Sequence, residues 1–125
     1  MASEVKPIVV AIVDDDEFVR SSLQGLMKAA GLSALAFASA EEFLNSSQKQ
    51  HTGCLIVDIR MPGMSGLELQ AKLNEIDHRI PIIFITAQGD DTMRMQALGA
   101  GAVKFFIKPL DKDVLMDSVR KVLNR

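Results

Sequence analysis

The chain has 125 residues, 48% of them hydrophobic, and a net charge of −2, which fits one folded domain and argues against disorder. The slight acidity argues against a domain that grips the phosphate backbone of nucleic acid, because such domains are usually basic. The single cysteine excludes an internal disulfide and a cysteine-based zinc site. No apolar run has the roughly 18 residues of a membrane span, so we expect a cytoplasmic protein that binds no membrane.

Five short apolar runs alternate with stretches of helical spacing. The first run, residues 8–13, is rich in β-branched residues, as in a strand buried on both faces of a sheet. The spacing predicts strands at 8–13, 34–37, 54–57, 81–85 and 103–107. Such alternation indicates an α/β fold with a parallel sheet covered on both faces.

The expected helices have recognisable ends. The first follows the acidic run 14–17 and stops at Gly31, and the second opens at a Ser39–Glu42 capping box. The third follows a loop at 60–66, the fourth covers 91–98 and closes at Gly99, and Asp111 caps the last. Residues 1–6 and 46–50 are expected to fray, and Gly63, Gly66 and Gly99 are interpreted as turn residues.

Four of the strands end in a polar or charged side chain. The residues are Asp14 and Asp15 after the first strand, Asp58 after the third, Thr86 after the fourth and Lys108 after the fifth. Because the carboxyl ends of parallel strands share one edge, we expect these groups to converge in a crevice there.

Three converging carboxylates repel one another, by about 4 kcal/mol per pair at 4 Å and an effective dielectric near 20. A proton, Lys108 or a bound cation must offset that repulsion. A hard divalent ion with oxygen ligands fits best, and Mg2+ takes one or two carboxylates plus a phosphate. One carboxylate is then left to attack a phosphoryl group, which Lys108 and the Thr86 hydroxyl would contact.

These motifs resemble the receiver domain of bacterial two-component response regulators, over about residues 6–124. The matching segments are 13–15, 58–66, 85–87, 99–102 and 108–109, which agree with the family in order, spacing and strand context. Segments 39–44 and 101–105 resemble the FixJ-type subgroup. The resemblance implies a single receiver domain over 1–125 and a flavodoxin-like (βα)5 three-layer sandwich with strand order 2-1-3-4-5.

The resemblance also implies a role for each matching residue. Asp58 would be the phosphoacceptor, and Mg2+ would be bound by Asp15, Asp58 and the backbone carbonyl of Arg60, with Asp14 acting through a metal-bound water. Lys108 would pair with the phosphoryl oxygens and form a cis peptide bond with Pro109. Thr86 would move toward the phosphoryl group, and Phe105 would turn inward into the space that Thr86 leaves. Asp16 has two open roles: a carboxylate just outside the direct metal ligands, or the N-cap of the following helix.

The expected partner is a sensor histidine kinase, and the expected activity is that of a switch, not an enzyme. The switch would promote its own phosphotransfer and the hydrolysis of its aspartyl phosphate. It would act through the face formed by the fourth helix, fifth strand and fifth helix, by dimerising or by controlling an output domain. A FixJ-type parent would carry a C-terminal DNA-binding domain outside these residues, so this domain itself is not expected to bind nucleic acid.

Three other interpretations compete. A phosphatase of the haloacid dehalogenase type would use Asp14 as nucleophile and Asp16 as general acid, but no Asp pair follows Lys108 and Asp58 would be idle. A flavodoxin would need a phosphate loop after the first strand and a stacking Trp or Tyr, and the sequence has neither. A pseudo-receiver that only binds partners would lack the acceptor or the Lys, and both are present.

Overall fold

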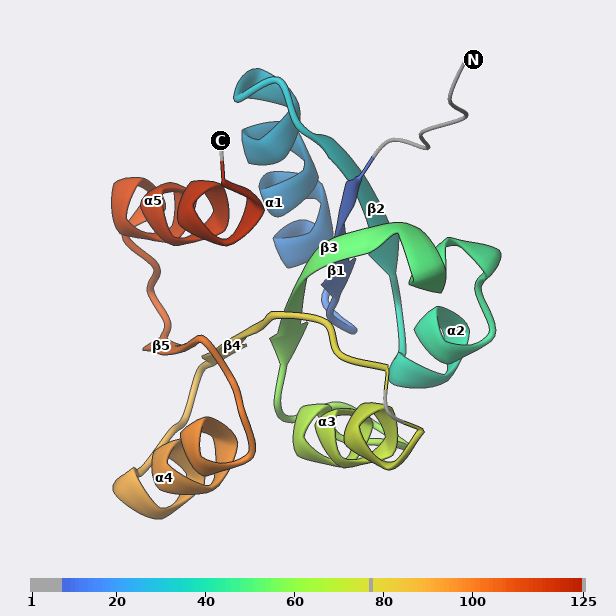
Figure 1. Cartoon of the computed structure of the whole chain (residues 1–125). Helices are drawn as coiled ribbons and strands as arrows, with labels where there is room; N and C mark the ends of the chain where they lie inside the picture. The colour runs from blue at the N-terminus through green and yellow to red at the C-terminus, as the bar shows by residue number, and fades with distance from the viewer. Residues whose placement is uncertain (1–7, 77, 125) are drawn as a thin grey trace.

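The computed structural model describes residues 8–76 and 78–124, in which five parallel strands alternate with helices (Figure 1). The strands are β1 (Val9–Val13), β2 (Ser33–Phe37), β3 (Thr52–Asp58), β4 (Ile82–Thr86) and β5 (Lys104–Ile107). The helices are α1 (Glu17–Ala29), α2 (Ala40–Leu44), α3 (Gly66–Glu75), α4 (Asp91–Gly99) and α5 (Lys112–Leu123), with a 3₁₀ helix η1 (Ser47–His51) before β3. The order β2-β1-β3-β4-β5 confirms the predicted flavodoxin-like fold.

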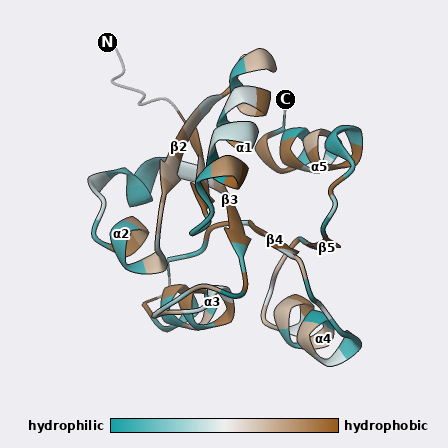
Figure 2. Cartoon of the chain, turned by 180° about the vertical axis from the view of Figure 1, so that it is seen from behind, coloured by the Kyte–Doolittle hydropathy of each residue, from teal (hydrophilic) through white to brown (hydrophobic). Residues whose placement is uncertain are grey.

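Two hydrophobic layers hold the helices against the sheet. One layer joins α2, α3 and α4 to one face, and the other joins α1 and α5 to the opposite face (Figure 1). All five residues of β1 and of β4 are buried, which explains their continuous apolar sequences. Figure 2 shows hydrophobic strands between helices that carry hydrophilic residues on their outer faces. Burial on both faces fixes the strands, and therefore the side chains at their carboxyl ends.

Side-chain caps begin the helices at the positions that the sequence signals predict. Asp16 caps α1 and Asp111 caps α5, while Gly31 follows α1 with a φ of 79°. Ser39 caps α2 by accepting the Glu42 N–H, but the Glu42 carboxylate accepts the Ala38 N–H, so this is half of a capping box. The complete capping box is at Ser65 and Glu68, which open α3, and the sequence analysis did not identify it.

Several local predictions were wrong, at residues 46–50, at two glycines and at the starts of strands. Residues 47–51 form η1 instead of fraying, because Ser46 caps the helix and the Lys49 ammonium donates to the Leu44 carbonyl. Helix α4 ends at Gly99 as predicted, but Gly99 is its last helical residue instead of a turn residue, and Gly101, with a φ of 107°, makes the turn after it. Gly66 is the first residue of α3 instead of part of a turn. Strand β5 begins at residue 104, not 103, and β3 begins at 52, not 54.

The prediction that residues 1–6 fray lies outside the described residues. Within 8–76 and 78–124, no helix is long and apolar enough to cross a membrane.

Candidate functional site

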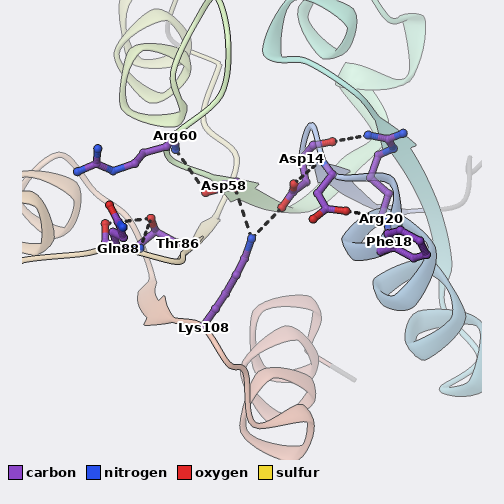
Figure 3. Close-up of polar contacts among 9 residues, drawn as sticks. Asp14, Phe18, Arg20, Asp58, Arg60, Thr86, Gln88 and Lys108 are labelled. Atoms are coloured by element: carbon purple, nitrogen blue, oxygen red, sulfur yellow. Dashed lines mark hydrogen bonds and ion pairs between the residues drawn. The ribbon is translucent and has the colours of Figure 1, made fainter.

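The four predicted strand ends meet at one edge of the sheet (Figure 3). Asp58 is the last residue of β3 and Thr86 the last of β4, while Asp14 and Lys108 directly follow β1 and β5. Because β1 and β3 pair in parallel, Val13 lies beside Val57, and the next residues, Asp14 and Asp58, come at the same edge of the sheet. The parallel topology thus produces the cluster from distant parts of the chain.

Three carboxylates form an open cluster at this edge. One oxygen each of Asp14, Asp15 and Asp58 lies within 4.8 Å of the others. Asp14 is fully buried and Asp58 is 7% exposed, whereas Asp15 is exposed, so the cluster has a closed base and a side open to solvent. A group of all-oxygen ligands with one open side suits a hard divalent cation such as Mg2+.

Lys108 supplies the positive charge. Its Nζ lies 3.4 Å from the Oδ2 of Asp14 and 3.4 Å from the Oδ2 of Asp58, longer than a tight charge-assisted hydrogen bond of about 2.8 Å. Burial raises the pKa of Asp14, and the nearby Asp58 charge raises it further, against the lowering effects of the Asp16 N–H and Lys108. Burial alone would lower the pKa of Lys108, but the two carboxylates outweigh it, and that pKa is raised. The ammonium therefore stays charged and ties the two carboxylates together.

The loop after β1 is held by hydrogen bonds that fix Asp14. The Asp14 Oδ1 accepts the Asp16 N–H at 2.8 Å, and the Asp14 carbonyl accepts from the Arg20 guanidinium at 2.7 Å (Figure 3). The Asp16 carboxylate itself accepts the Phe18 N–H at 2.8 Å. Of its two open roles, Asp16 thus has that of the N-cap, and the clustered carboxylates are the other three. The Arg20 contact was missed, because no motif in the sequence marks a side chain that folds back one helical turn.

Asp58 is held from the other side by the segment that leads from β3 into the start of α3. Its Oδ1 accepts the Arg60 N–H at 3.3 Å, while the Arg60 side chain is exposed. The Gly66 N–H donates to the Ile59 carbonyl at 2.8 Å. A Cβ on Gly66 would lie 2.5 Å from the Asp58 carbonyl oxygen, so only glycine lets α3 pack this closely behind Asp58.

Thr86 and Phe105 form the opposite wall. The Thr86 hydroxyl is buried and donates to the Gln88 carbonyl at 3.2 Å. Phe105 is 7% exposed, and a Cβ on Gly89 would lie 2.9 Å from its Cζ. The Phe105 ring is therefore already buried while Thr86 still bonds Gln88. The bare Gly89 backbone makes room for the ring in this state. The Lys108–Pro109 peptide bond is cis, as the resemblance implied.

Comparisons with known proteins identify the family of this chain. The model of the response regulator receiver domain matches residues 10–120. The chain belongs to the response regulator receiver domain family. It is 46% identical over 115 residues to the response regulator protein TodT of Pseudomonas putida, covering 92% of this chain and 51% of TodT.

The FixJ-like character is confirmed as well. The receiver domain is 38% identical to the transcriptional regulatory protein FixJ of Azorhizobium caulinodans, over 93% of this chain and 55% of FixJ. A crystal structure of FixJ-N superposes with a TM-score of 0.84 at 36% identity, covering 97% of both chains. The receiver domain is thus a signalling switch of the two-component type, and it spans about half the length of TodT and FixJ.

Proposed function

We propose that this receiver domain accepts one phosphoryl group on Asp58 from the phosphohistidine of a sensor histidine kinase. Mg2+ would be held by Asp15, Asp58 and the backbone carbonyl of Arg60, with Asp14 acting through a metal-bound water. The observation that carries the proposal is the Lys108 ammonium, which lies 3.4 Å from Asp14 and Asp58 at the base of a carboxylate cluster open on one side. That arrangement leaves room for one small anion beside a cation.

Asp58 is the carboxylate best placed to act as nucleophile. Asp14 is fully buried, so a donor cannot reach it. Asp58 keeps 7% exposure and lies between the Arg60 N–H and Lys108. An oxygen of Asp58 would form the new bond to phosphorus while the bond from phosphorus to the leaving nitrogen breaks. Bound Mg2+ would offset charge on the phosphoryl oxygens, and Lys108 would do the same from the other side.

Phosphorylation would act as a switch through Thr86. The phosphoryl group adds negative charge and strong hydrogen-bond acceptors at Asp58. The Thr86 hydroxyl would leave the Gln88 carbonyl and donate to a phosphoryl oxygen. Because Gln88 lies two residues after Thr86 and shortly before α4, this exchange would shift the loop that begins the helix. Two alternative partners for one hydroxyl make a two-state element that phosphorylation biases.

The α4–β5–α5 face would carry the output. It exposes large apolar side chains: Met95 and Leu98 on α4, Val103 and Ile107 at β5, and Val114 on α5. An apolar face of this kind suits a partner surface. We propose that it forms a homodimer on phosphorylation and controls an output domain. Because TodT and FixJ are about twice as long as this chain, we place a DNA-binding domain for transcriptional control outside it.

The kinase would approach over α1. Phe18, at the start of α1, is 88% exposed beside the acidic site (Figure 3). A groove of about 300 Å³ runs from it between α1 and residues 108–112, lined mostly by apolar side chains. This groove lies next to Lys108, so a protein seated there could bring its phosphohistidine to the site. We place this exchange in the cytoplasm and assign to the receiver domain the hydrolysis of its own aspartyl phosphate.

Labelling with acetyl phosphate and Mg2+ tests the acceptor. We expect the intact protein to gain one phosphoryl group, Asp58→Asn to gain none, and Asp16→Asn to be labelled like the wild type. Asp16 is the matched control, because its carboxylate caps α1 outside the cluster. Labelling that survives in Asp58→Asn and disappears in Asp14→Asn would instead indicate a haloacid dehalogenase type of chemistry.

Sedimentation with beryllofluoride tests the output face. We expect dimerisation of the wild type on activation and a monomer for Ile107→Lys, which puts a charge on the exposed end of β5. Ile76→Lys, at the end of α3, removes a similarly exposed isoleucine elsewhere and should dimerise like the wild type. An unchanged mass for the activated wild type at micromolar concentration would contradict dimerisation.

A further inference from the structure

The loop between β3 and α3 carries Arg60, whose carbonyl is the proposed backbone ligand, and it is secured at both ends. At its start, the Arg60 N–H donates to Asp58 at 3.3 Å. At its end, the Gly66 N–H donates to the Ile59 carbonyl at 2.8 Å, and the Ser65–Glu68 capping box fixes the first turn of α3. These contacts come from the loop and the helix that follows it.

The middle of the loop is held from a different element. The Oε2 of Glu41, in the first turn of α2, accepts the Met64 N–H at 3.1 Å, although the two residues are 23 positions apart. Helices α2 and α3 lie next to each other on one face of the sheet (Figure 1). The contact ties α2 to the segment that runs from Asp58 to α3.

Gly63 is shaped to receive the Glu41 carboxylate. It has a φ of 75°, a conformation that favours glycine, and a Cβ there would lie 2.8 Å from the Glu41 Oε2. A side chain at position 63 would therefore both strain the turn and displace the carboxylate. Both the positive φ of Gly63 and its lack of a side chain therefore favour the contact with the Glu41 carboxylate.

Two neighbouring carboxylates in α2 have different partners. Glu42 accepts the Ala38 N–H and thus serves its own helix start. Glu41 points instead to the Met64 N–H, outside the helix. The helix-capping motif at 39–42 accounts for Glu42 and leaves Glu41 free for a separate role.

We propose that Glu41 is a positioning residue for the metal-binding loop: it holds Gly63 and Met64 and so restrains the loop that carries the Arg60 carbonyl, the proposed backbone ligand. The inference rests on the proposed function, because it needs Mg2+ to bind at that cluster. Without the Glu41 contact, the loop would sample other conformations, and Mg2+ binding would have to bear the cost of ordering it.

Titration with MgCl2, followed by amide chemical shifts in NMR spectra, tests this role in the whole chain. We expect Glu41→Ala to weaken Mg2+ binding by about threefold to tenfold, the range for loss of one typical hydrogen bond, and to speed exchange of the Met64 amide proton. Glu41→Gln, which keeps an acceptor oxygen, should recover part of both losses. Glu42→Ala removes the same charge one residue away and should leave the Mg2+ affinity within about twofold of the wild type.

The outcomes separate the two proposals. If the wild type binds Mg2+ and Glu41→Ala binds it equally well, the positioning role is wrong, even if the variant melts earlier. If Glu42→Ala weakens binding as much as Glu41→Ala, the effect is general charge attraction and the positioning role is again wrong. If Mg2+ does not shift amides around Asp58 in the wild type, the proposed metal site itself fails.

Discussion

The Nζ of Lys108 lies 3.4 Å from the Oδ2 of Asp14, a carboxylate that is fully buried. This pair explains how an acidic residue at the end of a central strand is tolerated without solvent. The ammonium only partly offsets the cost of burial, because the pKa of Asp14 remains raised above its ordinary value. Burial of the Asp14 charge therefore destabilises the folded protein, to an extent that depends on pH and on bound metal.

Replacing Asp14 should stabilise the metal-free protein at neutral pH. Because the folded-state pKa is raised, wild-type stability falls as the pH rises from the ordinary value of 3.8 through the folded-state value. Asp14→Asn removes this loss and keeps an oxygen for the Asp16 N–H. In EDTA at pH 7 we expect its free energy of unfolding to exceed that of the wild type, because the pKa of Asp14 is raised in the folded state.

The same comparison at low pH is the control. Below pH 3.8 the carboxyl is protonated in both the folded and the unfolded chain, so the advantage of Asp14→Asn should vanish. Urea unfolding curves at both pH values measure the difference. An advantage of equal size at both would mean that its origin is not the titration of Asp14.

Mg2+ should stabilise the wild type through Asp15. A ligand that binds only the folded state adds about 2.7 kcal/mol at a hundredfold excess over its Kd. Asp15 is exposed and contributes a cluster oxygen, so Asp15→Asn should lose most of this gain while unfolding normally in EDTA. Thermal melts with MgCl2 and with EDTA measure it. Equal Mg2+ stabilisation of both proteins would contradict the proposed ligand set.

A methyl group at Gly66 should destabilise the fold and displace Asp58. The new Cβ would lie 2.5 Å from the Asp58 carbonyl oxygen and 2.9 Å from the Ile59 Cα, which are backbone atoms that cannot rotate away. We expect Gly66→Ala to lose about 2 kcal/mol or more in urea unfolding, the scale of backbone strain. Gly25→Ala in α1 meets nothing within 4 Å and should gain about 0.5–1 kcal/mol.

A methyl group at Gly89 should expel the Phe105 ring. Its Cβ would lie 2.9 Å from the Phe105 Cζ and 3.0 Å from the Thr86 Cγ2. We expect Gly89→Ala to weaken the nuclear Overhauser effects between the Phe105 ring and the Thr86 methyl while Asp58 is still labelled by acetyl phosphate. Gly99→Ala, where nothing lies within 4 Å, should leave these signals unchanged. A ring that stays in place in Gly89→Ala would show that the loop yields instead.

The sequence predicted the sheet and the place of the site because both follow from local patterns. Continuous β-branched runs exist only where strands are buried on both faces, and parallel topology then brings Asp14, Asp58 and Lys108 to one edge. Helix starts at Asp16 and Asp111 were predictable because a capping side chain bonds within its own turn.

Contacts between distant elements were not predictable in the same way. The approach of Gly66 to Asp58, the Arg20 contact with Asp14 and the Glu41 contact with Met64 depend on distances that no periodicity encodes. The 3₁₀ helix at 47–51 was missed because its polar residues give no hydrophobic signal. Its ties to the rest of the fold include a contact between His78 and the Lys49 carbonyl.

The strand order has a consequence for the newly made chain. The carboxylates at positions 14, 15 and 58 leave the ribosome early, whereas Lys108 is supplied by β5, the last strand, at the edge of the sheet. Until that edge has joined β4, the acidic residues have no ammonium between them. Synthesis proceeds at about 5–20 residues per second. The three carboxylates of a nascent chain are therefore without Lys108 for seconds, and the chain cannot act as a switch in that time.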